Sequence, residues 1–168
     1  METVALHERA RKLTAILFVD IVDATSLVVS LGDGPWAELL ERYHAVVRGA
    51  LEQHRGRLMD MAGDGFFATF EEAADAIQCA RGLQSPAERL GLELRSGVHI
   101  GHCWIADEKC AGADVHVGAR LASCAAPGEV LVSEEAAENA RGAGIAFTDR
   151  GLHSLKGLPG TRRVFAVG

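Results

Sequence analysis

The clearest hydrophobic pattern near the start of the chain is an apolar run that ends in an acid. Residues 13–20 are mostly apolar until they reach Asp20, which is typical of a buried strand whose last residue has a function. Residues 24–31 favour a short helix ending at Gly32. In residues 36–53 apolar side chains recur every three or four positions, as in an amphipathic helix.

Two apolar runs, residues 57–62 and 66–70, flank the sequence Gly63-Asp64-Gly65. An Asp-Gly step between apolar runs is a strong hairpin signal. A hairpin requires antiparallel pairing, so the sheet cannot be purely parallel.

The rest of the chain continues to alternate between helical and extended patterns. It predicts helices at 71–90, at 114–124 and after a Ser133 cap, strands at 92–100, 129–132, 147–149 and 163–167, and an irregular stretch at 101–112. We therefore expect an α/β (α+β) fold, with a mixed, mostly antiparallel sheet of about five to seven strands covered by helices. No repeat or linker divides it, so residues 13–168 are predicted to form one domain after an N-terminal segment, 1–12.

Composition narrows the classes of partner. The 168 residues include 17 Lys plus Arg against 23 Asp plus Glu, a net charge of −6, which disfavours broad nucleic-acid binding. No apolar run reaches membrane-span length and residues 1–12 lack a hydrophobic signal region, so we expect no membrane partner and a cytoplasmic location. The four cysteines form no CxxC pair; they are expected to be reduced and to act as small buried hydrophobes.

Asp20 and Asp64 are the strongest candidates for chemistry, because each interrupts apolar sequence where an unpaired carboxylate is costly. Two neighbouring carboxylates repel each other unless a proton or metal lies between them, and magnesium prefers such oxygen ligands. The alternative is that Asp64 is only a turn residue and Asp20 only a helix cap. The pattern alone leaves both interpretations open.

Five motifs occur in a fixed order along the chain. They are Phe18-Val19-Asp20-Ile21-Val22 with Thr25, Gly63-Asp64-Gly65-Phe66, Gly97-Val98-His99-Ile100-Gly101, Gly112 with Val115-His116-Val117-Gly118-Ala119-Arg120, and Leu155-Lys156-Gly157. With these motifs the chain resembles a class III nucleotidyl cyclase catalytic domain of the short bacterial, actinobacterial-like type. The resemblance spans residues 13–167 and implies a class III cyclase fold with a ferredoxin-like core.

The resemblance also implies a set of site residues. Two divalent cations, Mg²⁺ or Mn²⁺, would be held by Asp20, Ile21 and Asp64; phosphates would be bound by Val22, Asp23, Ala24, Thr25 and Lys156; His116 would orient the ribose and Arg120 would stabilise charge on the phosphate. Without the family, Lys156 could equally be a solvated surface lysine, Arg120 could be an ion-pair partner on a helix face, and His116 by itself would more readily be interpreted as a core histidine. The implied reaction is attack of the ribose 3′ oxygen on the α-phosphorus, with loss of pyrophosphate.

In this family one protomer supplies the acids and the phosphate loop, while the other supplies the remaining groups. A chain that carries both halves is expected to form a homodimer with two shared sites, and ATP or GTP is the expected substrate.

Two positions depart from the adenylate-forming pattern, in which a Lys and an acid read the base. Here Asp60 stands in the first position and Lys109 aligns with the second, although a shift of one or two residues would place Glu108 or Asp107 there. Asp60 could accept hydrogen bonds from guanine and Lys109 could donate to its O6. Family membership favours ATP, these two residues favour GTP, and a weakly active or degenerate nucleotide-binding domain is a third interpretation. A polymerase-like palm is disfavoured because no basic surface is evident.

Overall fold

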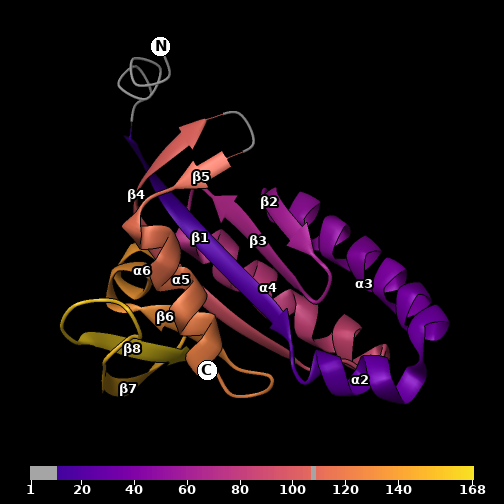
Figure 1. Ribbon diagram of the computed structural model, residues 1–168. Helices are drawn as coiled ribbons and strands as arrows, with labels where there is room; N and C mark the ends of the chain where they lie inside the picture. Colours follow the sequence, from indigo (N-terminus) through magenta and orange to yellow (C-terminus); the bar gives the residue numbers. More distant parts are fainter. Residues whose placement is uncertain (1–10, 107–108) are drawn as a thin grey trace, which may run out of the picture.

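The computed structural model describes residues 11–106 and 109–168, which fold around one open sheet (Figure 1). The strands are β1 (Arg11–Ile21), β2 (Arg57–Ala62), β3 (Gly65–Phe70), β4 (Leu94–Ala106), β5 (Lys109–Ala111), β6 (Val130–Ser133), β7 (Phe147–His153) and β8 (Arg162–Val167). Their order is β2-β3-β1-β4-β6-β8-β7, and β5 also pairs with β4. All pairs are antiparallel except β4 with β6, so the prediction of a mixed, mostly antiparallel sheet is confirmed.

The first four strands form the ferredoxin-like core. They are connected by the helices α2 (Ala24–Leu31), α3 (Asp33–Gln53) and α4 (Ala73–Arg89), in the chain order strand, helices, strand, strand, helix, strand. The two central strands of this unit are β1 and β3, and they run antiparallel. This topology confirms the predicted core and brings the end of β1 beside the start of β3.

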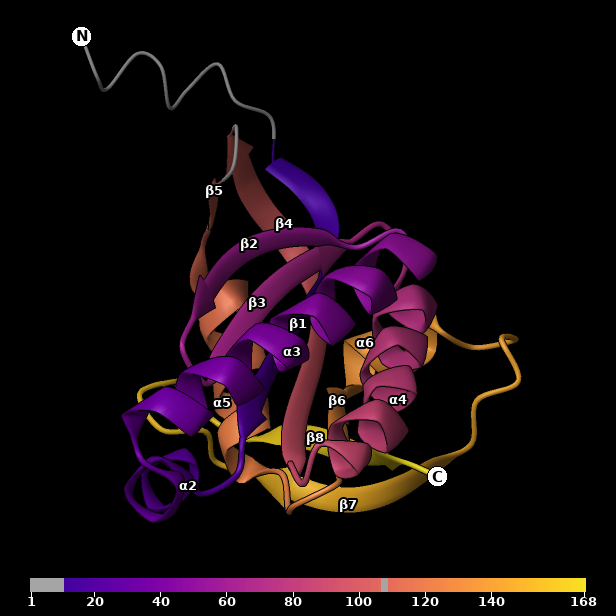
Figure 2. The same cartoon turned by 90° about the vertical axis from the view of Figure 1, so that its right-hand side faces the viewer.

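The sheet is covered differently on its two faces. Helices α3, α4 and α6 (Glu134–Asn139) pack on one face, which we call the core face, while α5 (Ala113–Cys124) crosses the other, the open face (Figure 2). Strand β1 serves both faces by alternation: Leu17 and Val19 belong to the main core cluster, whereas Ile16 and Phe18 lie against Gly118 of α5. None of the described helices is long and apolar enough to cross a membrane.

One predicted segment is wrong. Residues 101–112 were expected to be irregular, but β4 continues to Ala106 and the chain returns as β5, giving eight strands. Trp104 and Ile105 favour extended structure, but the charged residues that follow them within four positions look like a loop in sequence. The predicted Ser133 cap is confirmed, since its Oγ accepts a hydrogen bond from the Ala136 N–H at 3.1 Å.

Two glycines allow α5 to lie directly on the sheet. A Cβ on Gly97 of β4 would overlap the backbone of α5, with the Gly118 carbonyl oxygen only 2.6 Å away. A Cβ on Gly118 would lie 3.1 Å from Ile16 Cγ2. The close approach therefore depends on missing side chains at both positions, and it fixes the height of α5 above the sheet.

We expect Gly97→Ala to destabilise the protein by about 3 kcal/mol, because the backbone of α5 must move away to admit the methyl group. Gly49→Ala is the matched control: Gly49 is exposed on α3 with no atom within 4 Å of a new Cβ. That change should raise stability by roughly 0.5–1 kcal/mol through helix propensity. Urea unfolding of both variants measures the difference, and equal stability for the two would contradict the close packing of α5.

Candidate active site

The pairing of β1 with β3 brings the two candidate acids together. Asp20 lies opposite Gly65, and the Ile21 N–H donates a 2.9 Å hydrogen bond to the carbonyl oxygen of Asp64. The carboxylate of Asp20 lies over Gly65, with Oδ1 2.6 Å from where a Cβ at that position would stand. Gly65 is therefore glycine because the Asp20 carboxylate occupies the space of a side chain.

The hairpin between β2 and β3 is confirmed, but its turn residues differ from those expected. Ala62 pairs with Gly65, so the two-residue turn is Gly63-Asp64. Gly63 has φ +54°, a positive φ that suits the first central position of a type II′ turn. His44 Nε2 lies 3.1 Å from the Gly63 carbonyl oxygen, which ties this turn to α3. Asp64 is exposed at the tip, beside the half-buried Asp20.

The electrostatics of this acid pair suit positive charge. Burial, and then the negative charge of Asp64, raise the pKa of the Asp20 carboxyl; the guanidinium of Arg95, opposite Asp20 on β4, acts to lower it. The Tyr43 hydroxyl is buried without a hydrogen-bond partner among the described residues, and its pKa is raised by burial and by both acids. Two hard carboxylates that disfavour each other's charge are a suitable donor set for divalent cations. The described residues contain no cluster of three or more His, Cys, Asp or Glu side chains that could hold a metal ion.

The predicted phosphate segment begins α2 in an unusual conformation. Asp23 precedes the helix with φ 52° and ψ 38°, left-handed for a residue with a side chain, and makes no side-chain cap. The Ile21 and Val22 N–H groups already donate to the carbonyls of Asp64 and Glu93. The donors that remain for an anion are those of the first helical turn, including Ala24 and Thr25.

The other predicted catalytic residues lie elsewhere on the chain. His116 and Arg120 are one turn apart on α5, the first exposed and the second half-buried, and Lys156 is exposed in the loop between β7 and β8. Among the described residues, none of these three forms a hydrogen bond or ion pair with Asp20 or Asp64. Within the described part of one chain, the two predicted halves of the site are therefore not joined by a hydrogen bond or an ion pair.

A bulge in β2 decides which way Asp60 points. Leu58 pairs with Ala68, but Asp60 pairs with Phe67, so Met59 is an extra residue in the ladder. Phe67 stacks on Phe18 with ring centroids 4.6 Å apart and planes 2° from parallel. The bulge thus puts Asp60 on the open face, the one that carries Asp20.

Lys109 has a different orientation. It pairs with Ala106, whereas the next residue, Cys110, pairs with Ile105. By strand alternation Ile105 shares the open face with Cys103, so on β5 it is Cys110 that shares the face of Asp60, and Lys109 points to the opposite face. Asp60 and Lys109 form no ion pair in the described part of the chain. Glu108 and Asp107, the alternatives to Lys109, lie outside the described residues.

Two hydrogen bonds of a buried histidine, which the sequence did not predict, hold the start of α5 against the sheet. His99 on β4 is 1% exposed; its Nε2 lies 2.7 Å from Asp114 Oδ1 and its Nδ1 lies 2.7 Å from Ser133 Oγ. Asp114 accepts a hydrogen bond from Nε2–H. Burial favours the neutral imidazole, whose Nδ1 is then an acceptor for the Ser133 hydroxyl. Asp114 is two residues before His116. The sequence shows a lone histidine in an apolar strand, but it does not indicate which residues form hydrogen bonds with that histidine.

We expect His99 to make stability depend on pH. Burial lowers its pKa below the ordinary 6.5, opposed by Asp114 and Glu135 and assisted by Arg162. Below pH 6.5 the unfolded chain takes up a proton that the folded chain refuses, so stability falls as pH drops from 6.5 toward the lowered folded-state pKa.

His99→Gln should flatten this slope, since an amide can donate and accept at the same place without titrating. The measurement is the urea midpoint between about pH 7.5 and 5.5. His102→Gln, on the exposed part of the same strand, should keep the wild-type slope. An unchanged slope in His99→Gln would mean that His99 is not held neutral.

A family model, a relative and solved structures that match this chain are each named as nucleotidyl cyclases or as their catalytic domain. The sequence model described as "Adenylate and Guanylate cyclase catalytic domain" matches residues 7–167. A protein of Rhizobium meliloti (strain 1021) named "Putative adenylate cyclase 3" is 32% identical over 158 residues, covering 88% of this chain but only 27% of that protein. This chain thus spans about a quarter of that relative's length.

Solved structures agree on the fold. The adenylyl cyclase CyaB from P. aeruginosa superposes with a TM-score of 0.88 at 23% identity, covering 96% of both chains. The guanylyl cyclase Cya2 superposes with a TM-score of 0.86 at 22% identity, covering 95% of this chain and 93% of that one. The chain belongs to the adenylate and guanylate cyclase catalytic domain family, and its fold is that of the class III cyclases.

Proposed function

We propose that the protein acts as a homodimer that converts a nucleoside triphosphate, preferentially ATP, to its 3′,5′-cyclic nucleotide and pyrophosphate. The observation that carries this proposal is the register of β1 against β3, which puts Asp20 beside the hairpin turn that carries Asp64, at one end of these two central strands. Because no hydrogen bond or ion pair joins His116, Arg120 or Lys156 to this pair in the described part of one chain, the second protomer would supply them. Two equivalent sites would then form, one at each end of the interface.

One protomer would bind the metal ions and the phosphates. Asp20, Asp64 and the main chain of Ile21 would hold two divalent cations, Mg²⁺ or Mn²⁺, which when bound neutralise triphosphate charge and ease deprotonation of the 3′ hydroxyl. Within the segment Val22 to Thr25, the Val22 N–H is already used by Glu93, so the N–H groups of the first turn of α2, including those of Ala24 and Thr25, would bind phosphate oxygens, and the dipole of α2 favours that anion.

The groups from the second protomer would complete the site. Lys156 would contact the triphosphate, whose two terminal phosphates leave as pyrophosphate when the α-phosphorus is attacked. His116 would orient the ribose so that its 3′ oxygen faces the α-phosphorus. Arg120, one turn further along α5, would stabilise the negative charge that grows on that phosphate; losing such a donor typically costs about 10²–10³ in rate.

Mixing two inactive variants tests the shared site. Asp64→Asn and Arg120→Ala should each lose cyclase activity with ATP and Mn²⁺, because each removes one half of both sites. Random mixing makes half the dimers heterodimeric with one intact site each, so about a quarter of wild-type activity should return. Asp33→Asn, an exposed acid at the start of α3, is the control that keeps full activity.

The outcomes separate the hypotheses. If wild type and Asp64→Asn are equally inactive with ATP and with GTP, in Mg²⁺ or in Mn²⁺, the proposed enzymatic function is contradicted. The interpretation as a nucleotide-binding module then remains. Loss of activity in each variant without recovery on mixing would mean that both halves act within one chain.

GTP is the second candidate substrate, and Asp60 is the observation that favours it. Its carboxylate lies on the open face and could accept from the N1 and 2-amino donors of guanine, whereas Lys109, on the opposite face, is not placed to donate to O6 beside it. Adenine offers an acceptor at N1, which a carboxylate does not complement. The name of the Rhizobium meliloti relative supports ATP, whereas this hydrogen-bonding argument supports GTP.

Asp60→Lys should therefore raise the ratio of kcat/KM for ATP to that for GTP by roughly tenfold or more, since an ammonium donates to adenine N1 and opposes the guanine donors. Product separation after parallel incubations measures the ratio. Glu88→Lys makes the same charge change on the exposed end of α4 and should leave the ratio unaltered. Equal ratios for all three proteins would show that Asp60 does not read the base.

A further inference from the structure

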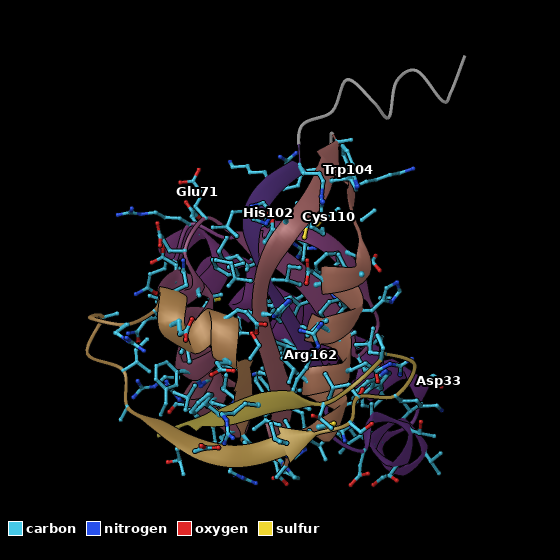
Figure 3. All side chains as sticks on the ribbon, turned by 90° about the vertical axis from the view of Figure 1, so that its left-hand side faces the viewer. Asp33, Glu71, His102, Trp104, Cys110 and Arg162 are labelled. Atoms are coloured by element: carbon cyan, nitrogen blue, oxygen red, sulfur yellow. The ribbon has the colours of Figure 1, made fainter. Side chains whose placement is uncertain are left out.

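The hairpin of β4 and β5 carries two cysteines on one face. Cys110 pairs directly with Ile105, and Cys103 lies two residues before Ile105 on β4. Residues two apart on a strand share a face, so Cys103 and Cys110 are diagonal neighbours across the ladder. Figure 3 labels the Cys110 side chain on this hairpin, and Trp104, which pairs with the next residue, Ala111, is labelled near it.

The two thiols have different environments. The neighbouring Cys103 thiol lowers the pKa of Cys110, whereas Cys110, and then burial, raise the pKa of Cys103. Cys103 is fully buried and its S–H donates to the Gly101 carbonyl oxygen at 3.8 Å, while Cys110 is half-buried. Cys110 is therefore suited to react first with a small oxidant, and Cys103 to react second.

The geometry of a bond between them is close to its limit. Diagonal neighbours in an antiparallel ladder are about 7–8 Å apart at Cα, whereas relaxed disulfides span about 4.4–6.8 Å. Closing the bond therefore requires β5 to shift relative to β4. A disulfide under such strain is more easily reduced than a structural one.

We propose that Cys103 and Cys110 form a reversible disulfide, made by a hydroperoxide and broken by small thiols, which switches the cyclase site. The Cys110 thiolate attacks the peroxide oxygen of H₂O₂, forming a sulfenic acid and releasing hydroxide, which takes up the proton lost by the thiol. The Cys103 thiol then attacks the sulfenic sulfur, forming the S–S bond and releasing water. Two thiols are oxidised and one H₂O₂ becomes two water molecules; two equivalents of glutathione reverse the change.

The position of the pair explains how it would act. Lys109 adjoins Cys110, and β5 leads through Gly112 directly into α5, where Asp114 holds His99. A shift of β5 would therefore displace the start of the helix that carries His116 and Arg120. This consequence for activity rests on the proposed function, whereas formation of the bond does not.

Thiol mapping tests the bond without any assay of activity. The full-length protein is treated with H₂O₂, its free thiols are alkylated, and it is cleaved with trypsin. Cleavage after Arg95, Lys109 and Arg120 separates Cys103 and Cys110 into different peptides, 96–109 and 110–120. Oxidised protein should yield these two joined, and dithiothreitol should release them. Cys103→Ser and Cys110→Ser should abolish the joined product, while Cys124→Ser, at the exposed end of α5, should retain it.

Cyclase activity tests the switch. Oxidation should lower kcat/KM by roughly tenfold in wild type and in Cys124→Ser, with recovery on reduction, and should not affect Cys103→Ser or Cys110→Ser. The proposal is overturned if the joined peptides are absent at peroxide levels that oxidise Cys124, or if they form without change in activity. If the reduced protein makes no cyclic nucleotide, the proposed function fails, and the mapping still decides whether the disulfide exists.

Discussion

The antiparallel pairing of β1 with β3 is the constraint on which the site depends. It places Asp20, near the end of the apolar strand β1, opposite the first residue of β3. Asp20 therefore lies beside the hairpin turn that carries Asp64. Bringing two carboxylates together is unfavourable by itself, and the pKa of Asp20 is raised first by burial and then by the charge of Asp64. The buried neighbours Leu17 and Val19 supply the packing that holds β1 in this register.

A second constraint is the distance between α5 and the sheet. Gly97 and Gly118 remove the side chains that would separate them, and the His99–Asp114 hydrogen bond fixes the start of the helix. The position of His116 and Arg120 is thus set by groups that never need to touch a substrate. The same strand, β4, carries Arg95 opposite Asp20, so one element contacts both halves of the proposed site machinery.

Much of this fold is visible in the sequence because periodicity reports burial. The apolar run before Asp20 and the helical period of residues 36–53 follow directly from which side chains face the core. The β4–β5 hairpin was missed because Trp104 and Lys109 are exposed on it, and exposed strands carry no hydrophobic signal. For the site, the nearness of Asp20 and Asp64 could be inferred from strand order, but the orientation of Lys109 and the partners of His99 could not, because both depend on registers between distant segments.

The extra residue at Met59 shows how much such registers matter. With regular pairing of the same sequence, Asp60 would lie opposite Phe66 and face the helices, and the open face would present Met59 instead. In the proposed site, the group that faces the nucleotide base would therefore depend on the number of residues along an edge strand as well as on their chemistry. Two relatives with the same acid in an alignment can thus differ in selectivity, if one of them lacks the bulge.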